Sequence, residues 1–298
     1  MVRRWFHFWR RYVPRISGCT PMEEEIKQEL SEKIRSSPAE VGLAIRGVDF
    51  DWQVDIHSDL VFRSASVIKV PLLAALFWLS ERRDLDWQEK IPLRDGDRTP
   101  GSGILRELHT GLELSLHDLA VLMIVLSDNT ATNMLIDRVG VEKVQEFLQL
   151  VGFRHTTLQR KMYDFAAAEQ GKENLCCAAE IADLLKWMAQ GEIRAVDGTP
   201  LVSSSGCERM LNIMHEQFYR DQIPYLLPNE AKVANKTGEI SGHHHDSAVI
   251  WMPAGCFTLV VLTRGFENRR TAARFISETA LMAYEAARQR LRKEDGEA

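Results

Sequence analysis

The first element that the chain predicts is an amphipathic helix. Apolar residues recur at every fourth position from Met22 to Ile34, and the glutamates at 23–25 lie in what would be its first turn. This spacing puts the apolar side chains on one face, and acidic residues near a helix N-terminus are favoured by the helix dipole. We therefore expect a helix over residues 22–35.

Strand-like patterns occur at both ends of the chain. Two short runs, 41–46 and 52–56, are joined by GVDFD and predict a hairpin. The later predicted elements are strands at 231–236, 247–252 and 257–263, followed by a helix at 269–292 with its apolar residues on one side. The two termini are therefore expected to build one sheet, which their helices cover.

The middle of the chain has helical periodicity instead. The predicted helices are 67–80, 116–126, 130–138, 141–151, 178–190 and 207–214. The clearest loop between them is RDGDRTPGSG at 94–103. We expect a discontinuous α/β domain (22–62 and 215–292) and an all-helical domain (63–214), with a site at their junction.

Composition narrows the function classes. The chain has 298 residues, of which 45% are hydrophobic and 27% charged, as in ordinary soluble proteins. Its net charge of −5 offers no basic surface for nucleic acid, so no such partner is expected. No apolar run approaches the roughly 18 residues that cross a bilayer.

Residues 1–21 form a basic arm with five arginines. Its ISGC resembles a lipoprotein cleavage box, but arginines interrupt the apolar stretch that a signal needs. Export, contact with anionic lipid and a disordered leader stay open. The cysteines lack metal-ligand spacing and predict free buried thiols in a reducing compartment, which favours the cytoplasm. They are Cys19, Cys176, Cys177, Cys207 and Cys256.

The first candidate chemistry lies in RSASVIKVPLLAALFWL, where Ser66 and Lys69 precede an almost purely apolar run. Residues three apart share a helix face, so the Lys69 amine is expected to point toward the Ser66 hydroxyl. An alcohol becomes a good nucleophile when a neighbouring base removes its proton, and burial lowers the pKa of a lysine. A serine cap beside a snorkelling lysine is the alternative.

Two further motifs follow. VLSDNTATNML places Ser127, Asp128 and Asn129 between two helices; Ser127 could relay a proton, Asn129 could hold a substrate carbonyl, and Asp128 is expected to brace the loop. AKVANKTGEISG ends a strand with Lys236 and the residues TG, which suit a substrate carboxylate lying along an edge strand. A helix cap and a strand end are the respective alternatives.

Together, S-x-x-K, S-D-N and K-T-G in this order resemble class A β-lactamases and penicillin-binding proteins. SDNTATNMLIDRVG, LVSSSGCERMLNIM and KTG…SAVIWMP extend the resemblance, which covers about residues 22–292. It implies an α+β fold of the β-lactamase/transpeptidase type. In that fold an antiparallel sheet of about five strands lies between the N- and C-terminal helices and an all-helical domain.

The resemblance implies a role for each motif residue. Ser66 would attack an amide or ester carbonyl to form an acyl-enzyme, with Lys69 assisting its activation. Ser127 would pass a proton to the leaving group, aided by Lys236, while Asn129 orients the substrate.

The substrate-binding residues would also include Thr237, Gly238 and Glu239. Thr237 would help to bind a substrate carboxylate, and the backbone N–H groups of Ser66 and Glu239 would form the oxyanion hole. The partner would be a small molecule, a β-lactam or another amide or ester with a carboxylate. No cofactor or metal is implied, and the oligomeric state is left open.

One loop departs from the family pattern. Class A enzymes carry an Arg followed two residues later by a Glu that activates the deacylating water, whereas Arg160 is followed by Met162. Ala166 aligns with the family's water-binding Asn, and Asn174 would pair with Arg160. Asp164 is either a displaced base or a solvated acid.

The stretch after K-T-G departs as well. Glu239 would put an anion close to the acyl site, and three histidines, His243 to His245, follow. These histidines could form a surface turn, contact substrate, supply the missing base or bind a metal. Adjacent strand residues face opposite sides, which disfavours the metal.

Three functions follow from these features. The leading hypothesis is a serine acyl hydrolase of the β-lactamase type. A penicillin-binding D,D-peptidase, transpeptidase or esterase would share its chemistry. A non-catalytic ligand-binding relative is the third.

Overall fold

A computed structural model describes residues 21–294. The first helix, α1 (Pro21–Arg35), begins at Pro21. The predictions for the basic arm, its ISGC box and Cys19 lie outside the described residues.

One five-stranded antiparallel sheet lies at the centre of the fold, in the order β2-β1-β11-β10-β9. Its strands are β1 (Glu40–Gly47), β2 (Gln53–Ile56), β9 (Lys232–Ile240), β10 (His243–Met252) and β11 (Gly255–Arg264). The sheet joins the two ends of the chain, since β1 pairs with β11 along its whole length. The predicted α+β fold with its five-stranded sheet is confirmed.

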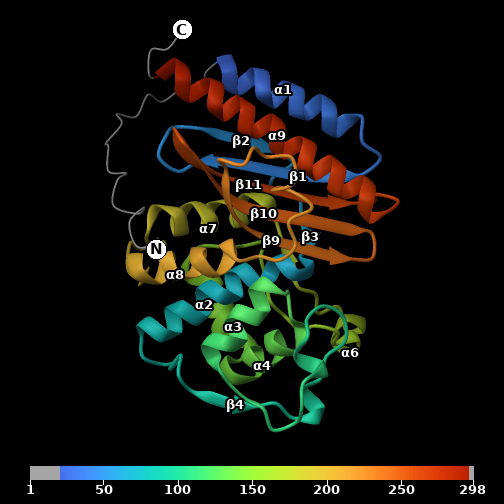
Figure 1. The fold of residues 1–298 in the computed structure, drawn as a ribbon, viewed down its shortest axis with the longest axis vertical. Helices are drawn as coiled ribbons and strands as arrows, with labels where there is room; N and C mark the ends of the chain where they lie inside the picture. The colour runs from blue at the N-terminus through green and yellow to red at the C-terminus, as the bar shows by residue number, and fades with distance from the viewer. Residues whose placement is uncertain (1–20, 295–298) are drawn as a thin grey trace.

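Two terminal helices cover one face of this sheet. In Figure 1, α1 and α9 (Arg269–Glu294) lie side by side across the strands. The apolar stripe of α1 supplies Ile26, Leu30 and Ile34 to the core between these helices and the sheet. The periodicity that predicted this helix therefore also determines which side it buries.

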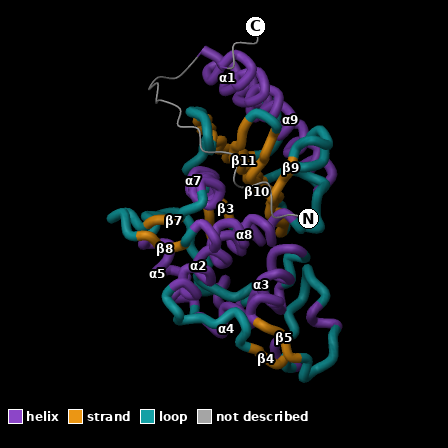
Figure 2. Tube along the Cα trace, turned by 60° about the vertical axis from the view of Figure 1, so that its left-hand side comes forward, coloured by secondary structure: helices purple, strands orange, loops and turns teal. Residues whose placement is uncertain are grey.

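The middle of the chain packs on the other face, as Figures 1 and 2 show. Its helices are α2 (Lys69–Glu81), α3 (Leu116–Val125), α4 (Asn129–Val139), α5 (Val141–Leu150), α6 (Phe165–Glu169), α7 (Ala178–Gln190) and α8 (Ser204–His215). Helix α2 is buried from Lys69 to Leu79 and runs through this second core. The predicted domain boundaries stay a prediction.

Short elements connect the helices. The strands are β3 (Phe62–Arg63), β4 (Lys90–Pro92), β5 (Glu113–Ser115), β6 (Leu175–Cys176), β7 (Ile193–Arg194) and β8 (Pro200–Val202), and the 3₁₀ turns are η1 (Ala65–Ile68), η2 (Asp95–Asp97) and η3 (Leu105–Glu107). No helix within residues 21–294 is both long enough and apolar enough to cross a membrane.

Several boundaries differ from the predicted ones. The helix expected at 207–214 begins at Ser204, because Ser203 caps it with its side chain. Strand β9 ends at Ile240 and strand β10 begins at His243, so both are longer than predicted and only a two-residue turn separates them. The sequence pattern did not predict these extensions, because the residues in them are mostly polar. Whether such residues form a strand depends on how they pack more than on residue type.

Candidate active site

Ser66 lies in the tight turn η1, between β3 and the first residue of α2. The backbone N–H of Lys69 donates to the Ser66 carbonyl, and Ala65 before it has a positive φ of 45°. A 3₁₀ turn eclipses residues three apart, so both side chains leave the same side of the chain. The Ser66 side chain is half-buried, and its hydroxyl forms no hydrogen bond with another residue between 21 and 294.

The Lys69 amine is fully buried and points to the S-D-N motif. It donates to the Ser127 carbonyl at 2.7 Å, to Ser127 Oγ at 3.2 Å and to Asn129 Oδ1 at 2.8 Å. The Lys69 amine was expected to point toward the Ser66 hydroxyl. Within residues 21–294 it forms no hydrogen bond with that hydroxyl, because three other oxygens satisfy it. Burial, together with the charge of Lys236, holds the pKa of Lys69 well below its usual value.

A second buried lysine reaches the same hydroxyl. Lys236 Nζ donates to Ser127 Oγ at 3.0 Å and to the carbonyl of Thr237 at 2.7 Å. Burial lowers the pKa of Lys236 to about 7, although nearby Asp246 opposes the shift. Ser127 itself has a positive φ of 54° at the junction of α3 and α4. One hydroxyl is therefore shared by two amines, in a backbone conformation that serine seldom adopts.

Gly238 allows β9 to lie against the Ser66 turn. A Cβ on Gly238 would come within 3.1 Å of the Val67 nitrogen and 3.2 Å of the Ala65 Cβ. Such contacts are tighter than most real Cβ contacts, so a larger residue at 238 would require Val67 or Ala65 to shift. The K-T-G and S-x-x-K motifs, far apart in sequence, thereby become neighbours.

The other S-D-N side chains organise the loop before η3. Asp128 accepts hydrogen bonds from the backbone N–H groups of Ile104 and Leu105, both at 2.7 Å, and it also caps α4. The expectation that Asp128 braces a loop is confirmed. Asn129 donates from Nδ2 to the carbonyl of Pro100 at 3.0 Å, so both ends of its amide have partners.

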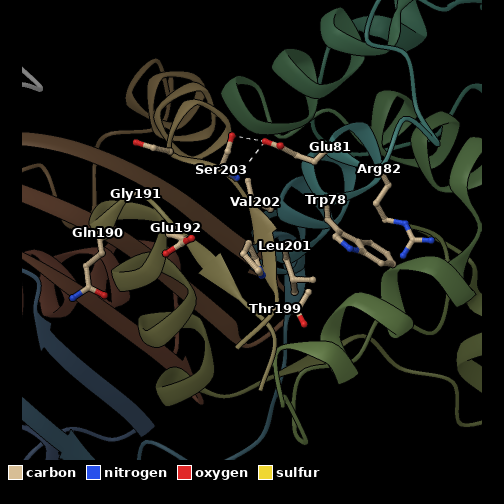
Figure 3. Close-up of a pocket in the computed structure, with 12 residues that line it drawn as sticks. Trp78, Glu81, Arg82, Gln190, Gly191, Glu192, Thr199, Leu201, Val202 and Ser203 are labelled. Carbon is tan, nitrogen blue, oxygen red and sulfur yellow. Dashed lines mark hydrogen bonds between the residues drawn. The ribbon is translucent and has the colours of Figure 1, made fainter. Parts of the chain in front are cut away.

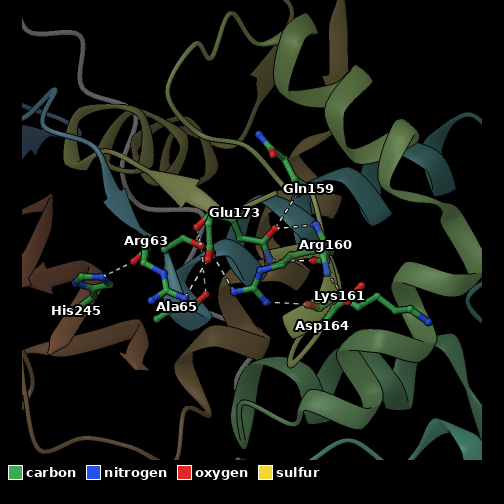
Figure 4. Close-up of polar contacts among 11 residues, drawn as sticks. Arg63, Ala65, Gln159, Arg160, Lys161, Asp164, Glu173 and His245 are labelled. Carbon is green, nitrogen blue, oxygen red and sulfur yellow. Dashed lines mark hydrogen bonds and ion pairs between the residues drawn. The ribbon is translucent and has the colours of Figure 1, made fainter. Parts of the chain in front are cut away.

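The loop around Arg160 is held differently from the prediction. The Arg160 guanidinium pairs with Glu173 at 3.0 Å, and Glu173 also pairs with Arg63 at 3.1 Å (Figure 4). Asn174 instead bonds to the backbone: its Oδ1 accepts from Gln159 and Arg160, and its Nδ2 donates to the Arg160 carbonyl. The predicted Arg160–Asn174 side-chain pair is wrong, because Glu173 offers the charge that a guanidinium prefers.

Met162 replaces the expected carboxylate with an apolar side chain that packs against the helical core. Its backbone is fixed by Asn133, which donates from Nδ2 to the Met162 carbonyl at 3.0 Å and accepts from the Met162 N–H at 2.8 Å. Asp164 caps α6 by accepting from the Ala167 N–H at 3.0 Å. Its carboxylate thus has a structural partner on its own loop.

Glu239 faces away from Lys236, since strand residues three apart lie on opposite faces. Its carboxylate pairs with Arg269 at 2.9 Å, and Arg269 also pairs with Asp221 at 2.7 Å. The Glu239 carboxylate is therefore not an isolated charge, because an arginine from α9 compensates it. Its expected position close to the acyl site stays a prediction.

The three histidines are buried in strand β10, so the surface-turn interpretation is wrong. His245 accepts from the Thr263 N–H at Nδ1 and donates from Nε2 to the Arg63 carbonyl at 2.9 Å (Figure 4). Burial lowers the pKa of His245 to about 4, so it is neutral near pH 7. The rings of His243 and His245 lie 5.9 Å apart, whereas His244 lies 3.9 Å from Glu239 on the other face.

A separate cavity of about 670 Å³ opens at the C-terminal end of α2 (Figure 3). Trp78, Arg82 and Glu192 line it, together with Ser203, which donates to Glu81 at 2.5 Å. None of the residues of the three motifs lines it. Across residues 21–294, moreover, no three His, Cys, Asp or Glu side chains are grouped as metal ligands.

The fold and the motifs agree with one family. The sequence profile described as "Beta-lactamase enzyme family" matches residues 22–287. The chain belongs to this family. The resemblance that the three motifs predicted is thereby confirmed.

Known members are distant in sequence. A β-lactamase of Rhodobacter capsulatus is 28% identical over 159 residues, which cover 52% of this chain and 53% of that protein. Beta-lactamase CTX-M-8 of Citrobacter amalonaticus is 26% identical over 272 residues, 88% of this chain and 89% of its own. These relatives are named β-lactamases, so the chain is related to hydrolases of the class A type.

Solved structures agree. PBP-A superposes with a TM-score of 0.80 at 26% identity, covering 93% of this chain and 100% of its own. The β-lactamase of Sphaerobacter thermophilus superposes with a TM-score of 0.77 at 28% identity, covering 88% and 96%. A mutant of PBP-A is described as an acyl-enzyme complex with penicillin G.

Three residues near the site escaped the sequence reasoning. Asn133 could have been found, because it follows S-D-N by four residues and therefore shares a helix face with Asn129. Glu173 and Asp246 gave no local signal: each is one acid among many, and only the folded chain shows what it faces.

Proposed function

We propose that this chain is a serine acyl hydrolase that becomes acylated at Ser66 by a β-lactam or a related amide or ester. The observation that carries the proposal is the shared hydroxyl: two buried amines, Lys69 and Lys236, both reach Ser127 Oγ next to the Ser66 turn. A serine cap or a snorkelling lysine would have no reason to bury both amines against one hydroxyl.

Acylation begins with proton transfer. Because burial favours the neutral amine, Lys69 can accept the Ser66 proton as Oγ attacks the carbonyl carbon. Lys69 is the first residue of α2 and leaves the turn on the same side as Ser66, so in the proposed mechanism its flexible stem rotates to move Nζ from Asn129 to Ser66. The absence of a resting hydrogen bond does not exclude this base, since such bonds often tighten only when substrate is bound.

The proton then leaves through Ser127. Its Oγ accepts from both lysines, so it can pass a proton to the leaving nitrogen or oxygen while Lys69 or Lys236 replaces it. The tetrahedral oxyanion would be bound by the backbone N–H groups of Ser66 and Glu239, which contribute about 3–4 kcal/mol each in serine enzymes. The close approach of Gly238 to the Ser66 turn supports this pairing.

Release of the acyl group is expected to be slow. Water must be deprotonated to attack the ester, and the residue at the family's Glu position is Met162, which packs into the helical core. The alternatives have other roles, since Asp164 caps α6 and both nitrogens of His245 are hydrogen-bonded. We therefore infer that a penicilloyl ester on Ser66 persists.

A time course of intact mass after exposure to benzylpenicillin tests the proposal. We expect the mass to rise by one penicillin, to stay raised over many minutes, and not to rise in Ser66→Ala. Absence of any adduct, together with no hydrolysis of nitrocefin or simple esters, would contradict the enzymatic proposal.

The missing carboxylate favours a second candidate, a D,D-peptidase or transpeptidase in which an amine replaces water as the acyl acceptor. A D-amino acid added after acylation should then shorten the lifetime of the adduct. If Ser66→Ala binds ligand and keeps its cellular role unchanged, a non-catalytic function replaces both candidates.

A further inference from the structure

A second, smaller pocket shares Glu81 with the cavity of Figure 3. It has a volume of about 270 Å³ and lies between the C-terminal end of α2 and the first turn of α8. Most of its lining is polar, and the polar side chains are those of Ser80, Glu81, Arg83, Trp87, Ser205 and Arg209. None of these residues belongs to the three motifs, so the pocket is separate from the proposed acyl site.

Two arginines line this pocket without an ionic partner. The Arg209 guanidinium lies over the rings of Phe77 and Trp87, at 5.0 Å and 5.5 Å from their centroids. Neither Arg83 nor Arg209 forms an ion pair or a side-chain hydrogen bond with another residue between 21 and 294. Each guanidinium therefore keeps its N–H donors for a ligand.

Arg83 occupies a backbone position that favours glycine. Its φ is 64°, and the helix α2 ends here because the N–H groups of Arg83 and Asp84 donate to the Ser80 and Leu79 carbonyls. A residue with a Cβ is strained in this left-handed conformation, and strained residues concentrate at functional sites. The carboxylate of Asp84 pairs with Arg82 at 3.0 Å, so it leaves the charge of Arg83 uncompensated.

Neutral donors add to the pocket. Ser80 and Ser205 each have a hydroxyl that bonds to no other residue of the described range 21–294. Trp87 is only 7% exposed, and its indole N–H has no partner in that range. Since buried polar groups are normally paired, this N–H points to a missing acceptor. Ser205 also belongs to the first turn of the twelve-residue helix α8, whose dipole favours negative charge.

One carboxylate opposes the positive charge. Glu81 Oε1 accepts from the Ser203 N–H at 3.2 Å and from the Ser203 hydroxyl at 2.5 Å, which ties it to the capping residue of α8 (Figure 3). Two arginines against one glutamate leave one positive charge in excess on the lining. The pocket therefore favours an anion.

We propose that this pocket binds a phosphate group, either inorganic phosphate or the end of a small phosphomonoester, through Arg83 and Arg209. Guanidinium groups bind phosphate through paired N–H donors, and a dianion compensates two arginines where a single carboxylate would not. The volume of about 270 Å³ is below that of pockets for drug-sized ligands, which suits so small a group. Neither this site nor the proposed acyl chemistry depends on the other.

Calorimetry on the whole chain tests the proposal with inorganic phosphate and with glycerol phosphate, at an ionic strength kept constant with sodium chloride. NMR follows the indole N–H of Trp87, whose signal is assigned with Trp87→Phe. The variants are Arg209→Gln and Arg83→Gly, which removes the guanidinium and suits the positive φ. Arg270→Gln is the control, because it removes the same charge from an exposed position in α9.

We expect Arg209→Gln and Arg83→Gly each to weaken phosphate binding at least about tenfold, and Arg270→Gln to keep it within about twofold. Phosphate should also shift the Trp87 signal of the unmutated protein, a readout that needs no variant to fold. Binding of either compound supports the proposal, and the tighter one tells free ion from ester.

Three results would overturn the proposal: no binding of either compound, equal weakening in Arg270→Gln, or an unmoved Trp87 signal. Attachment to vesicles that contain phosphatidic acid, without binding of either soluble compound, would assign the arginines to a membrane surface and would overturn it as well.

Discussion

Lys69 and Lys236 both donate to the hydroxyl of Ser127. The proposed chemistry depends on which of these two amines carries a proton. Two cations in one buried site repel each other, so one of the two amines loses its proton first. Burial and the charge of Lys236 both lower the pKa of Lys69, and Asp128 opposes this shift. Burial lowers the pKa of Lys236 and Asp246 opposes that shift, with no lowering by a second cation. In the proposed mechanism, this asymmetry favours Lys69 as the base and Lys236 as the cation.

The division predicts a bell-shaped pH dependence of acylation. The rate should rise as pH rises through the lowered pKa of Lys69, because only the neutral amine accepts a proton. It should fall above about pH 7, as Lys236 loses its charge. Lys236→Arg keeps that charge at higher pH. Its acylation should be slower overall, but the alkaline fall in rate should begin at least about one pH unit higher than in the wild type. An alkaline limb at the same pH in both proteins would refute the assignment.

Met162 leads to a second prediction at this scale. Met162→Glu puts a carboxylate at the position where class A relatives have one, on a backbone that Asn133 holds fixed. General bases accelerate such steps by about 10²–10⁴, so the penicilloyl adduct should be released at least tenfold faster in intact-mass time courses. Met162→Gln has the same size but no basic oxygen, and equal release by the two variants would show that the carboxylate is not placed to act.

At the scale of elements, the site is the contact between strand β9 and the turn η1. Strand β9 carries Lys236, the turn carries Ser66, and the missing side chain of Gly238 sets their separation. Helix α4 contributes from the third side, through Asn129 and Asn133. All three elements contribute residues to one hydrophobic core, including Val67, Ala131 and Ala234, so the geometry of the site follows from packing.

Gly238→Ala should therefore damage both stability and reactivity. The added methyl would lie 3.1 Å from the Val67 nitrogen, and overpacking of this kind costs about 1–3 kcal/mol of unfolding free energy. Acylation by benzylpenicillin should slow at least tenfold, as β9 moves away from Ser66. Gly96→Ala is the control, because no atom lies within 4 Å of its Cβ. If Gly238→Ala is acylated as fast as this control, the contact does not set the geometry.

At the scale of the whole molecule, two cores lie on opposite faces of one sheet, and a buried arginine helps to join them. Arg46 of β1 pairs with Asp55 of β2 at 2.9 Å and with Asp183 of α7 at 2.8 Å. Its side chain is only 6% exposed, whereas the two carboxylates reach solvent in part. The arginine thus connects the sheet to the helical layer.

Arg46→Ala should lower the unfolding free energy by about 3 kcal/mol, because it leaves two carboxylates beside each other without their cation. Urea denaturation measures this loss, and the rate of acylation should stay close to that of the wild type because Arg46 lies in none of the three motifs. Asp55→Asn keeps the Asp183 pair and should cost less. An equal loss in both variants would show that the α7 contact contributes nothing.

Particular residues show how far the sequence could be interpreted. The four-residue spacing from Met22 to Ile34 predicted α1 and its buried face, and the three motifs predicted the family. The partners of charged side chains were harder to predict: Arg160 meets Glu173 rather than Asn174, and Glu239 meets Arg269. The histidines of β10 were expected in a surface turn because they are polar, but the neighbouring parts of the fold bury them.

The sequence by itself determined the elements, the order of the motifs and the family, since periodicity and short motifs depend on residues that are close along the chain. The tertiary structure alone decided which oxygens the Lys69 amine contacts, how near β9 comes to Ser66, and that Arg83 and Arg209 line one pocket. These contacts join segments tens of residues apart, and their distances depend on how whole layers pack, which no local pattern encodes.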